Sequence, residues 1–138
     1  MIEQTTRYGI AVSVPLDYHR AVAHTKAALA AEGFGVLSEI DVRATLKNKL
    51  DVDFRPYVIL GACNPRLAYR ALTAERELGL LLPCNVVVYA DDLPGRSVIA
   101  AMDPVEALQL TGNDQIRPVA EEVKARLTRA LEAVERSA

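Results

Sequence analysis

Three short apolar runs without charged residues constrain the fold of this chain most. They span residues 8–14 (YGIAVSV), 57–62 (YVILGA) and 85–90 (NVVVYA). Uninterrupted apolar runs of this length are typical of strands buried in a sheet. Strands of this kind are buried only where other elements pack against them. The chain is therefore predicted to fold around a sheet that helices cover.

Two further segments complete the predicted sheet. Residues 36–42 (VLSEIDV) alternate between the two faces of an extended chain, which predicts a half-exposed strand. The sequence Asp-Asp-Leu-Pro-Gly at 91–95 is a strong turn signal. Residues 97–101 (SVIAA) are therefore expected to be the return strand of a hairpin.

Helical patterns separate these strands. Apolar side chains at steps of three and four predict a helix that begins after Asp17 and ends before Gly33. Further helices are expected over 43–50, from Asn64 to Gly79, over 103–110 and over 117–136. This order predicts one globular domain over residues 1–138, an α/β (α+β) sandwich of helices packed on a sheet of about five strands.

The composition excludes several classes of protein. With 51% hydrophobic and 25% charged residues, the 138-residue chain is not intrinsically disordered. A net charge of −2 and only 5% aromatic residues argue against a nucleic-acid partner. No apolar run approaches the ~20 residues that span a bilayer, so no membrane partner is expected. Residues 1–7 lack the apolar core of a signal peptide, and we expect a cytoplasmic protein.

Cys63 occupies the most distinctive position in the sequence. It follows a predicted buried strand and directly precedes a helix that begins at Asn64-Pro65. In open α/β sheets ligands bind at this edge, and a helix N-terminus favours anions and thiolates. The turn is therefore a candidate for a reactive thiolate or an anion site. The alternative is a buried small side chain, since free cysteines are among the most buried residues.

A second Cys-Asn pair, Cys84-Asn85, begins the next strand. If the two strands are parallel neighbours, Cys63 and Cys84 lie at opposite edges of the sheet, roughly 17–20 Å apart. A disulfide needs Cα atoms within ~7 Å, so no disulfide is expected. The spacing also fits neither a redox Cys-x-x-Cys motif nor a zinc knuckle.

Glu39 and Asp41 share one face of strand 36–42. Two such carboxylates suit a hard cation or an acid and base pair, and they are the candidate metal ligands. The alternative is the solvent side of an amphipathic strand, because alternation alone produces this pattern. His19 and His24 lack the i,i+4 spacing of a helical metal pair.

Several segments together resemble a known family. They are 32–42 (EGFGVLSEIDV), 57–65 (YVILGACNP), 80–89 (LLLPCNVVVY) and Asp103-Pro104. In this order and spacing they resemble the bacterial and archaeal family called domain of unknown function 302, over about residues 8–110. The family motif includes Glu39, Asp41, Cys63, Asn64, Pro65, Pro83, Cys84 and Asn85. The resemblance implies a compact α/β domain that forms a dimer, with no assigned activity, and leaves 117–136 at its edge as a cap or dimer contact.

Three functions are compatible with these residues. The favoured one is a non-catalytic homodimer that binds a small molecule or a metal ion. Its candidate binding residues are Glu39, Asp41, Cys63, Asn64, Cys84 and Asn85. The second is an enzyme with Cys63 as nucleophile, for which the sequence supplies no obvious base. The third is a structural or interaction module that associates through Leu80–Leu82 and the last helix. The sequence names no ligand, cofactor or reaction.

Overall fold

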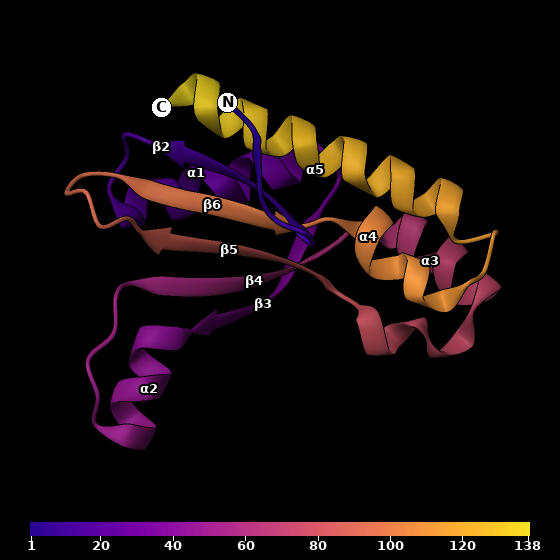
Figure 1. Cartoon of the computed structure of the whole chain (residues 1–138), viewed down its shortest axis with the longest axis horizontal. Helices are drawn as coiled ribbons and strands as arrows, with labels where there is room; N and C mark the ends of the chain where they lie inside the picture. The colour runs from indigo at the N-terminus through magenta and orange to yellow at the C-terminus, as the bar shows by residue number, and fades with distance from the viewer.

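Six strands form a single antiparallel sheet in the computed structural model, which describes residues 1–138 (Figure 1). The elements follow the order β1 (Glu3–Thr6), β2 (Gly9–Val14), α1 (Tyr18–Ala31), β3 (Gly35–Asp41), α2 (Val42–Leu50), β4 (Tyr57–Cys63), α3 (Pro65–Ala74), η1 (Arg76–Leu81), β5 (Cys84–Ala90), β6 (Ser97–Met102), α4 (Pro104–Leu108), η2 (Gln109–Thr111) and α5 (Arg117–Ser137), where η marks a 3-10 helix. This arrangement confirms the predicted class of helices packed on one sheet.

The strand order is β1-β2-β6-β5-β4-β3, with antiparallel neighbours throughout. The predicted hairpin around residues 91–95 is confirmed as the β5–β6 turn. The additional strand, β1, has the polar sequence EQTT and is exposed along its length. The sequence does not predict β1, because the segment has no alternation of apolar and polar residues. Its pairing with β2 holds it in the extended conformation.

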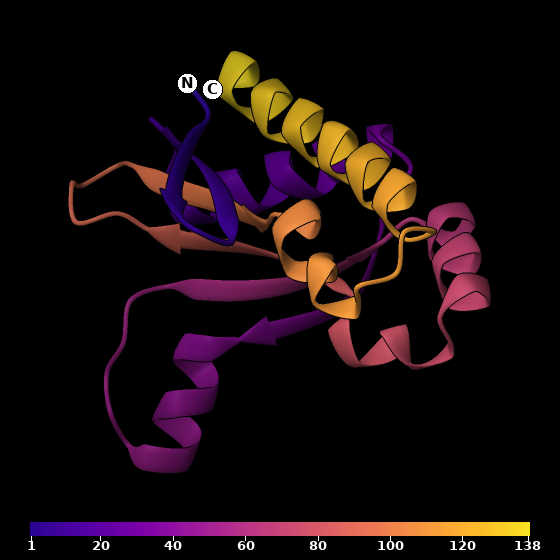
Figure 2. The ribbon, with the colours of Figure 1, turned by 45° about the vertical axis from the view of Figure 1, so that its right-hand side comes forward.

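Helices α1 and α5 lie side by side and cover one face of the sheet (Figures 1 and 2). The inward side chains of β4, β5 and β6 alternate with half-exposed ones, as expected for a sheet covered on one side. The apolar stripe of α5 is buried in this core, at Val119, Val123, Leu127, Leu131 and Val134. That stripe is therefore not free to serve as a dimer contact or interaction surface. No helix of the chain, α5 included, has the length and apolar character to cross a membrane.

The helix after β4 is shorter than its apolar pattern predicts. It ends at Ala74 instead of continuing to Gly79, because Glu75 is extended and a 3-10 helix follows it. A side chain from the loop before α5 holds this end: Asn113 Nδ2 donates to the Ala74 carbonyl at 3.3 Å and to Glu75 Oε1 at 3.2 Å. A distant residue thus ends a helix whose own sequence could continue.

The second face of the sheet carries no covering helix. Its side chains are half-exposed and uncharged across three central strands: Tyr57, Ile59, Val87, Tyr89, Val98, Ala100 and Met102. The Tyr57 and Tyr89 rings stack there, with centroids 5.3 Å apart and planes 8° from parallel. We call these seven residues the uncovered face.

Candidate functional site

The two Cys-Asn pairs lie at the same end of the sheet, where β4 ends and β5 begins. The strands are antiparallel, and Ala62 faces Cys84 in their register. The prediction that Cys63 and Cys84 lie at opposite edges of the sheet, as they would on parallel strands, is therefore wrong. The reason is the path of α3 and η1, which lie beyond the end of the sheet and return the chain to that end instead of crossing a face (Figure 1). Both cysteines are free thiols.

A small apolar pocket opens at this end, between the sheet, α3, α4 and α5. Its volume is about 40 Å³. It is lined by Phe34, Ala62, Cys63, Asn64, Leu67, Ala68, Ala71, Leu82, Cys84, Leu108, Val119 and Val123. We call it the thiol pocket. It brings together three of the residues that the sequence singles out, Cys63, Asn64 and Cys84.

Asn64 fixes the rim of the thiol pocket. Its Oδ1 accepts a hydrogen bond from the Leu67 N–H at 3.4 Å, and Pro65 follows it, so the predicted cap of α3 is confirmed. Gly33 packs against this cap with a φ of +86°, and a Cβ there would lie 3.0 Å from Asn64 Nδ2. Both the conformation and the close approach require glycine, so the end of α1 and the start of α3 are held together.

The thiols differ in environment. Burial, with a smaller contribution from the neighbouring Cys63, raises the pKa of Cys84 from its ordinary 9.0 to about 11. Cys84 therefore stays protonated at neutral pH, while Cys63 is only partly buried. Neither histidine lines the pocket, and His24 Nδ1 lies 2.9 Å from Ser137 Oγ on α5. No imidazole stands beside either thiol to act as a base.

Asn85 lies apart from the thiol pocket. Because strand residues alternate between faces, Asn85 points away from Cys84 and is exposed. It lines a groove of about 380 Å³, and Tyr57 and Tyr89 of the uncovered face line the same groove. The structure therefore divides the second Cys-Asn pair between two surfaces.

Glu39 and Asp41 also lie away from the thiols. In the register of β3 and β4, Asp41 faces Val58 while Gly35 faces Cys63. Asp41 therefore lies five residues along β4 from Cys63, about 16 Å at ~3.3 Å per residue. Glu39 faces Leu60 and lies three residues from Cys63, about 10 Å at the same spacing. The sequence hypothesis that these carboxylates stand near the Cys63 turn does not match this geometry.

Both carboxylates have partners within the fold. Glu39 Oε2 lies 2.8 Å from Lys26 Nζ, and Asp41 Oδ1 accepts from the Ala44 N–H at 2.9 Å as the cap of α2. With Tyr18 and His19 they line a shallow depression of about 290 Å³. Burial, Asp41 and Glu39, in that order, raise the pKa of Tyr18. No group of three or more His, Cys, Asp or Glu side chains in the chain could hold a metal ion.

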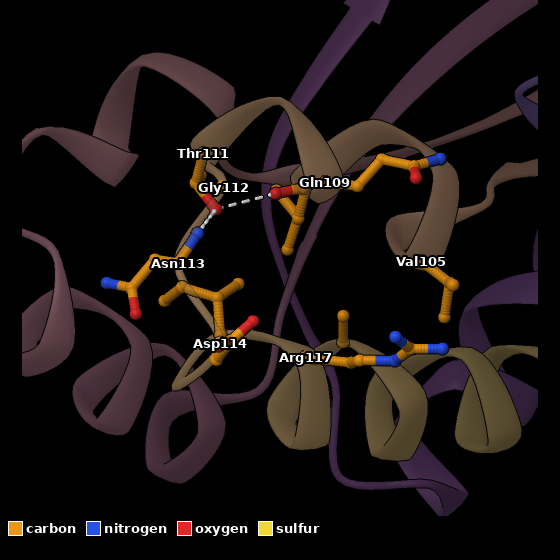
Figure 3. A pocket seen from close by; sticks show the side chains of 10 residues that line it. Val105, Gln109, Thr111, Gly112, Asn113, Asp114 and Arg117 are labelled. Carbon is orange, nitrogen blue, oxygen red and sulfur yellow. Dashed lines mark hydrogen bonds between the residues drawn. The ribbon is translucent and has the colours of Figure 1, made fainter.

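A fourth cavity, of about 180 Å³, lies between α4, η2 and the start of α5 (Figure 3). Most of its polar groups are already engaged within the loop. Thr111 Oγ1 donates to the Leu108 carbonyl and accepts from the Asn113 N–H, and the Gly112 N–H donates to the Gln109 carbonyl. The cavity is therefore best explained as the packing of a tight connection.

A basic groove adjoins the thiol pocket and was not singled out by the sequence. It has a volume of about 540 Å³ and is lined by Gly33, Asn64, Pro65, Arg66, Leu67, Arg70, Glu122 and Arg126. We call it the arginine groove. The only local signal is the pair Arg66 and Arg70, one turn apart behind the Asn64 cap. The third arginine, Arg126, belongs to α5. No pattern within a single segment of the sequence indicates that α5 lies beside α3.

Comparisons with known proteins agree with this architecture. The chain is similar to the crystal structure of an uncharacterised conserved DUF302 protein from Bacillus stearothermophilus, with a TM-score of 0.85 and 29% sequence identity. The alignment covers 93% of this chain and 98% of that one. A search of curated proteins finds no match.

The family comparison covers most of the chain. The sequence model of the family "Domain of unknown function DUF302" matches residues 10–134. The match extends past the 8–110 range of the sequence resemblance and takes in nearly all of α5, as expected for a helix that supplies the core of the fold. The chain belongs to the DUF302 family.

Proposed function

We propose that this protein is a non-catalytic, homodimeric binding protein whose small ligand sits at the Cys63–Asn64 turn. The observation that carries the proposal is the thiol pocket, where Cys63, Asn64 and Cys84 meet at the junction of the sheet with α3 and α5. Apolar pockets with a few polar groups at their rim are the usual sites of small ligands. The pocket is small, so the ligand group that enters it is small too.

Two observations favour binding over catalysis at this site. A cysteine enzyme with Cys63 as nucleophile needs a base within hydrogen-bond reach, and neither His19 nor His24 lines the pocket. Cys84 cannot replace that base, because its raised pKa of about 11 keeps it a neutral thiol. Glu39 and Asp41 are engaged by Lys26 and by the start of α2, so a metal ion is not part of the proposal.

Amide chemical-shift titration with 1-butanol tests the pocket. We expect saturable shifts at the amides of Cys63, Asn64 and Leu67. Ala68→Leu, which places three extra carbons against the pocket, should abolish them. Ala125→Leu, at an exposed position of α5, should leave them unchanged. Absence of saturable shifts in the wild type, or equal shifts in the Ala68 variant, would contradict the proposal.

The homodimer would form through the uncovered face of the sheet. None of the seven residues of this face is charged, and their half-exposed side chains are mostly aromatic or branched aliphatic. A two-fold interface brings the same patch together from both copies, so an uncharged surface can face itself without repulsion. Homodimer interfaces are also more apolar than the remaining protein surface. The dimer implied by the family resemblance supports a second copy as the occupant.

Light scattering coupled to size-exclusion chromatography tests the dimer. The wild type should elute at twice its chain mass of 15.0 kDa. Ile59→Lys and Val87→Lys, which place charges on neighbouring strands of the uncovered face, should elute as monomers. Leu93→Lys, in the exposed β5–β6 turn, should remain dimeric. A monomeric wild type, or a dimer that both lysine variants preserve, would refute this interface.

A further inference from the structure

The arginine groove and the thiol pocket are neighbours, since Asn64 and Leu67 line both. We propose that the groove binds the oxyanion head, carboxylate or phosphate, of a small organic anion whose short apolar end enters the thiol pocket. This inference rests on the proposed function and adds the chemical class of its ligand. It follows from three properties of the groove.

The first property is uncompensated positive charge. The side chains of Arg66 and Arg70 are exposed and form no ion pair or hydrogen bond with any residue of the chain. They lie one helical turn apart on α3, and like charges at this spacing destabilise a helix. Three arginines and one glutamate line the groove, whereas the whole chain has a net charge of −2. An anion between these side chains relieves their repulsion.

The second property is the fixed position of Arg126. Its Nη1 donates to the Glu32 carbonyl at 3.2 Å, which anchors the guanidinium between α1 and α5. Its Nε lies 3.6 Å from Glu122 Oε2 and is a buried polar atom without a hydrogen-bond partner. Buried donors nearly always have partners, and a bound water or anion is one group that could supply the missing partner here. Arg126 is therefore a pre-positioned cation at the wall of the groove, supplied by α5 while the other two arginines come from α3.

The third property is the orientation of α3. Pro65 has no N–H, and the N–H of Arg66 belongs to the first helical turn, where no intrahelical acceptor is available. The N-terminus of a helix carries partial positive charge, so the backbone and the arginine side chains favour an anion at the same point. Asn64 caps the Leu67 N–H and keeps this end rigid.

The volumes of the thiol pocket and of the arginine groove limit the ligand. The thiol pocket, at about 40 Å³, has room for about three water-sized groups. The groove, at about 540 Å³, leaves ample space for a head group. A planar guanidinium binds carboxylate and phosphate oxygens with two parallel hydrogen bonds, so both heads fit. Short-chain carboxylates and short alkyl phosphates are therefore the expected class.

Amide-shift titrations of the full chain at low salt with butyrate, butyl phosphate, inorganic phosphate and 1-butanol test the inference. At least one of the two organic anions should bind about ten-fold or more tightly than 1-butanol, and more weakly as salt is added. Arg66→Gln and Arg70→Gln should each weaken that binding about ten-fold. Arg43→Gln removes one exposed charge from α2, far from the groove, and should change binding less than two-fold. Comparison of butyrate with butyl phosphate identifies the preferred head.

Two patterns overturn the inference: organic anions that bind no more tightly than 1-butanol, or Arg43→Gln weakening binding as much as the groove variants do. The Ala68→Leu variant separates this inference from the proposed function. If 1-butanol shifts the pocket amides and the organic anions bind no more tightly than 1-butanol, the proposed pocket is supported and the anion site is refuted. If phosphate binding depends on Arg66 and Arg70 but Ala68→Leu changes the binding of none of the four compounds, the anion site is supported and the apolar pocket is refuted.

Discussion

Lys124 on α5 forms an ion pair with a fully buried carboxylate, its Nζ lying 2.8 Å from Asp103 Oδ2. Asp103 is 1% exposed. Its Oδ1 accepts from the N–H groups of Val105 at 2.9 Å and Glu106 at 3.4 Å, which begins α4. One side chain thus starts α4 and fixes it to α5. Both helices line the thiol pocket, so this contact also sets the pocket wall.

Removal of the Asp103 carboxylate should be strongly destabilising. Asp103→Ala breaks the ion pair and the helix cap together, and should lower the free energy of unfolding by about 3–4 kcal/mol. Lys124→Met leaves the carboxylate its two backbone donors and should cost about 1–2 kcal/mol. Urea denaturation measures both. Glu121→Gln, which breaks the exposed Arg117–Glu121 pair, is the control and should cost less than about 0.5 kcal/mol. Equal losses for Asp103→Ala and the control would disprove this role.

Gly61 permits the close approach of three chain segments. A Cβ at this position would lie 2.3 Å from Ser38 Oγ and 2.9 Å from Pro83 Cγ. Gly61→Ala should therefore destabilise the fold by about 1–3 kcal/mol, measured by urea denaturation. The loss should be smaller in a Ser38→Ala background, which removes the nearest atom. Gly79→Ala, where a Cβ meets nothing within 4 Å, is the control. An equally harmless change at both glycines would show that the segments can separate.

The local features of the fold follow from the sequence because short-range rules determine them. Asp17, Asn64 and Asp103 each cap a helix with their own side chain, and Gly33 ends α1 with a positive φ. Each of these contacts spans only a few residues, so the pattern contains both partners. The apolar period of α5 likewise reports a single buried stripe.

The features that the sequence does not reveal depend on partners far along the chain. The direction of β5 relative to β4 decides whether Cys63 and Cys84 meet, and it depends on where α3 packs. The sequence around Asp103 predicts the start of a helix, but its ion pair with Lys124 forms only because α5 packs beside α4. Arg126 reaches the arginine groove only because α5 crosses beside α3. These relations arise from packing between elements, which no single segment encodes.

The two thiols should differ sharply in alkylation. Cys84 is 6% exposed and protonated at neutral pH, whereas Cys63 is partly exposed. Alkylation requires an accessible thiolate. Iodoacetamide applied to the native protein at about pH 7.5 should modify Cys63 alone, as peptide mass spectrometry reports. Cys63→Ser should abolish native labelling, and urea should expose both sites in the wild type. Native modification of Cys84 at a comparable rate would contradict the described burial.

The stability of the fold should decrease with alkaline pH through Cys84. Its pKa is raised from 9.0 to about 11, so below pH 9 the folded and unfolded chains both keep the thiol proton. Between pH 9 and about 11 the unfolded chain releases this proton while the folded chain retains it. The unfolded state then binds fewer protons, and the free energy of unfolding decreases as pH rises. The two-unit difference corresponds to a loss of about 3 kcal/mol at most.

Comparison with Cys84→Ala isolates the contribution of this thiol. Tyr18 and Tyr57 also have pKa values raised by burial, and they produce an alkaline decrease of the same sign in both proteins. Urea denaturation at about pH 8 and pH 10.5 should show a smaller decrease for Cys84→Ala than for the wild type, because only the tyrosines remain. The variant starts from a lower stability, since a buried side chain is shortened. The decisive quantity is therefore the change with pH, and equal changes in the two proteins would mean that the Cys84 thiol ionises as easily in the folded chain as in the unfolded one.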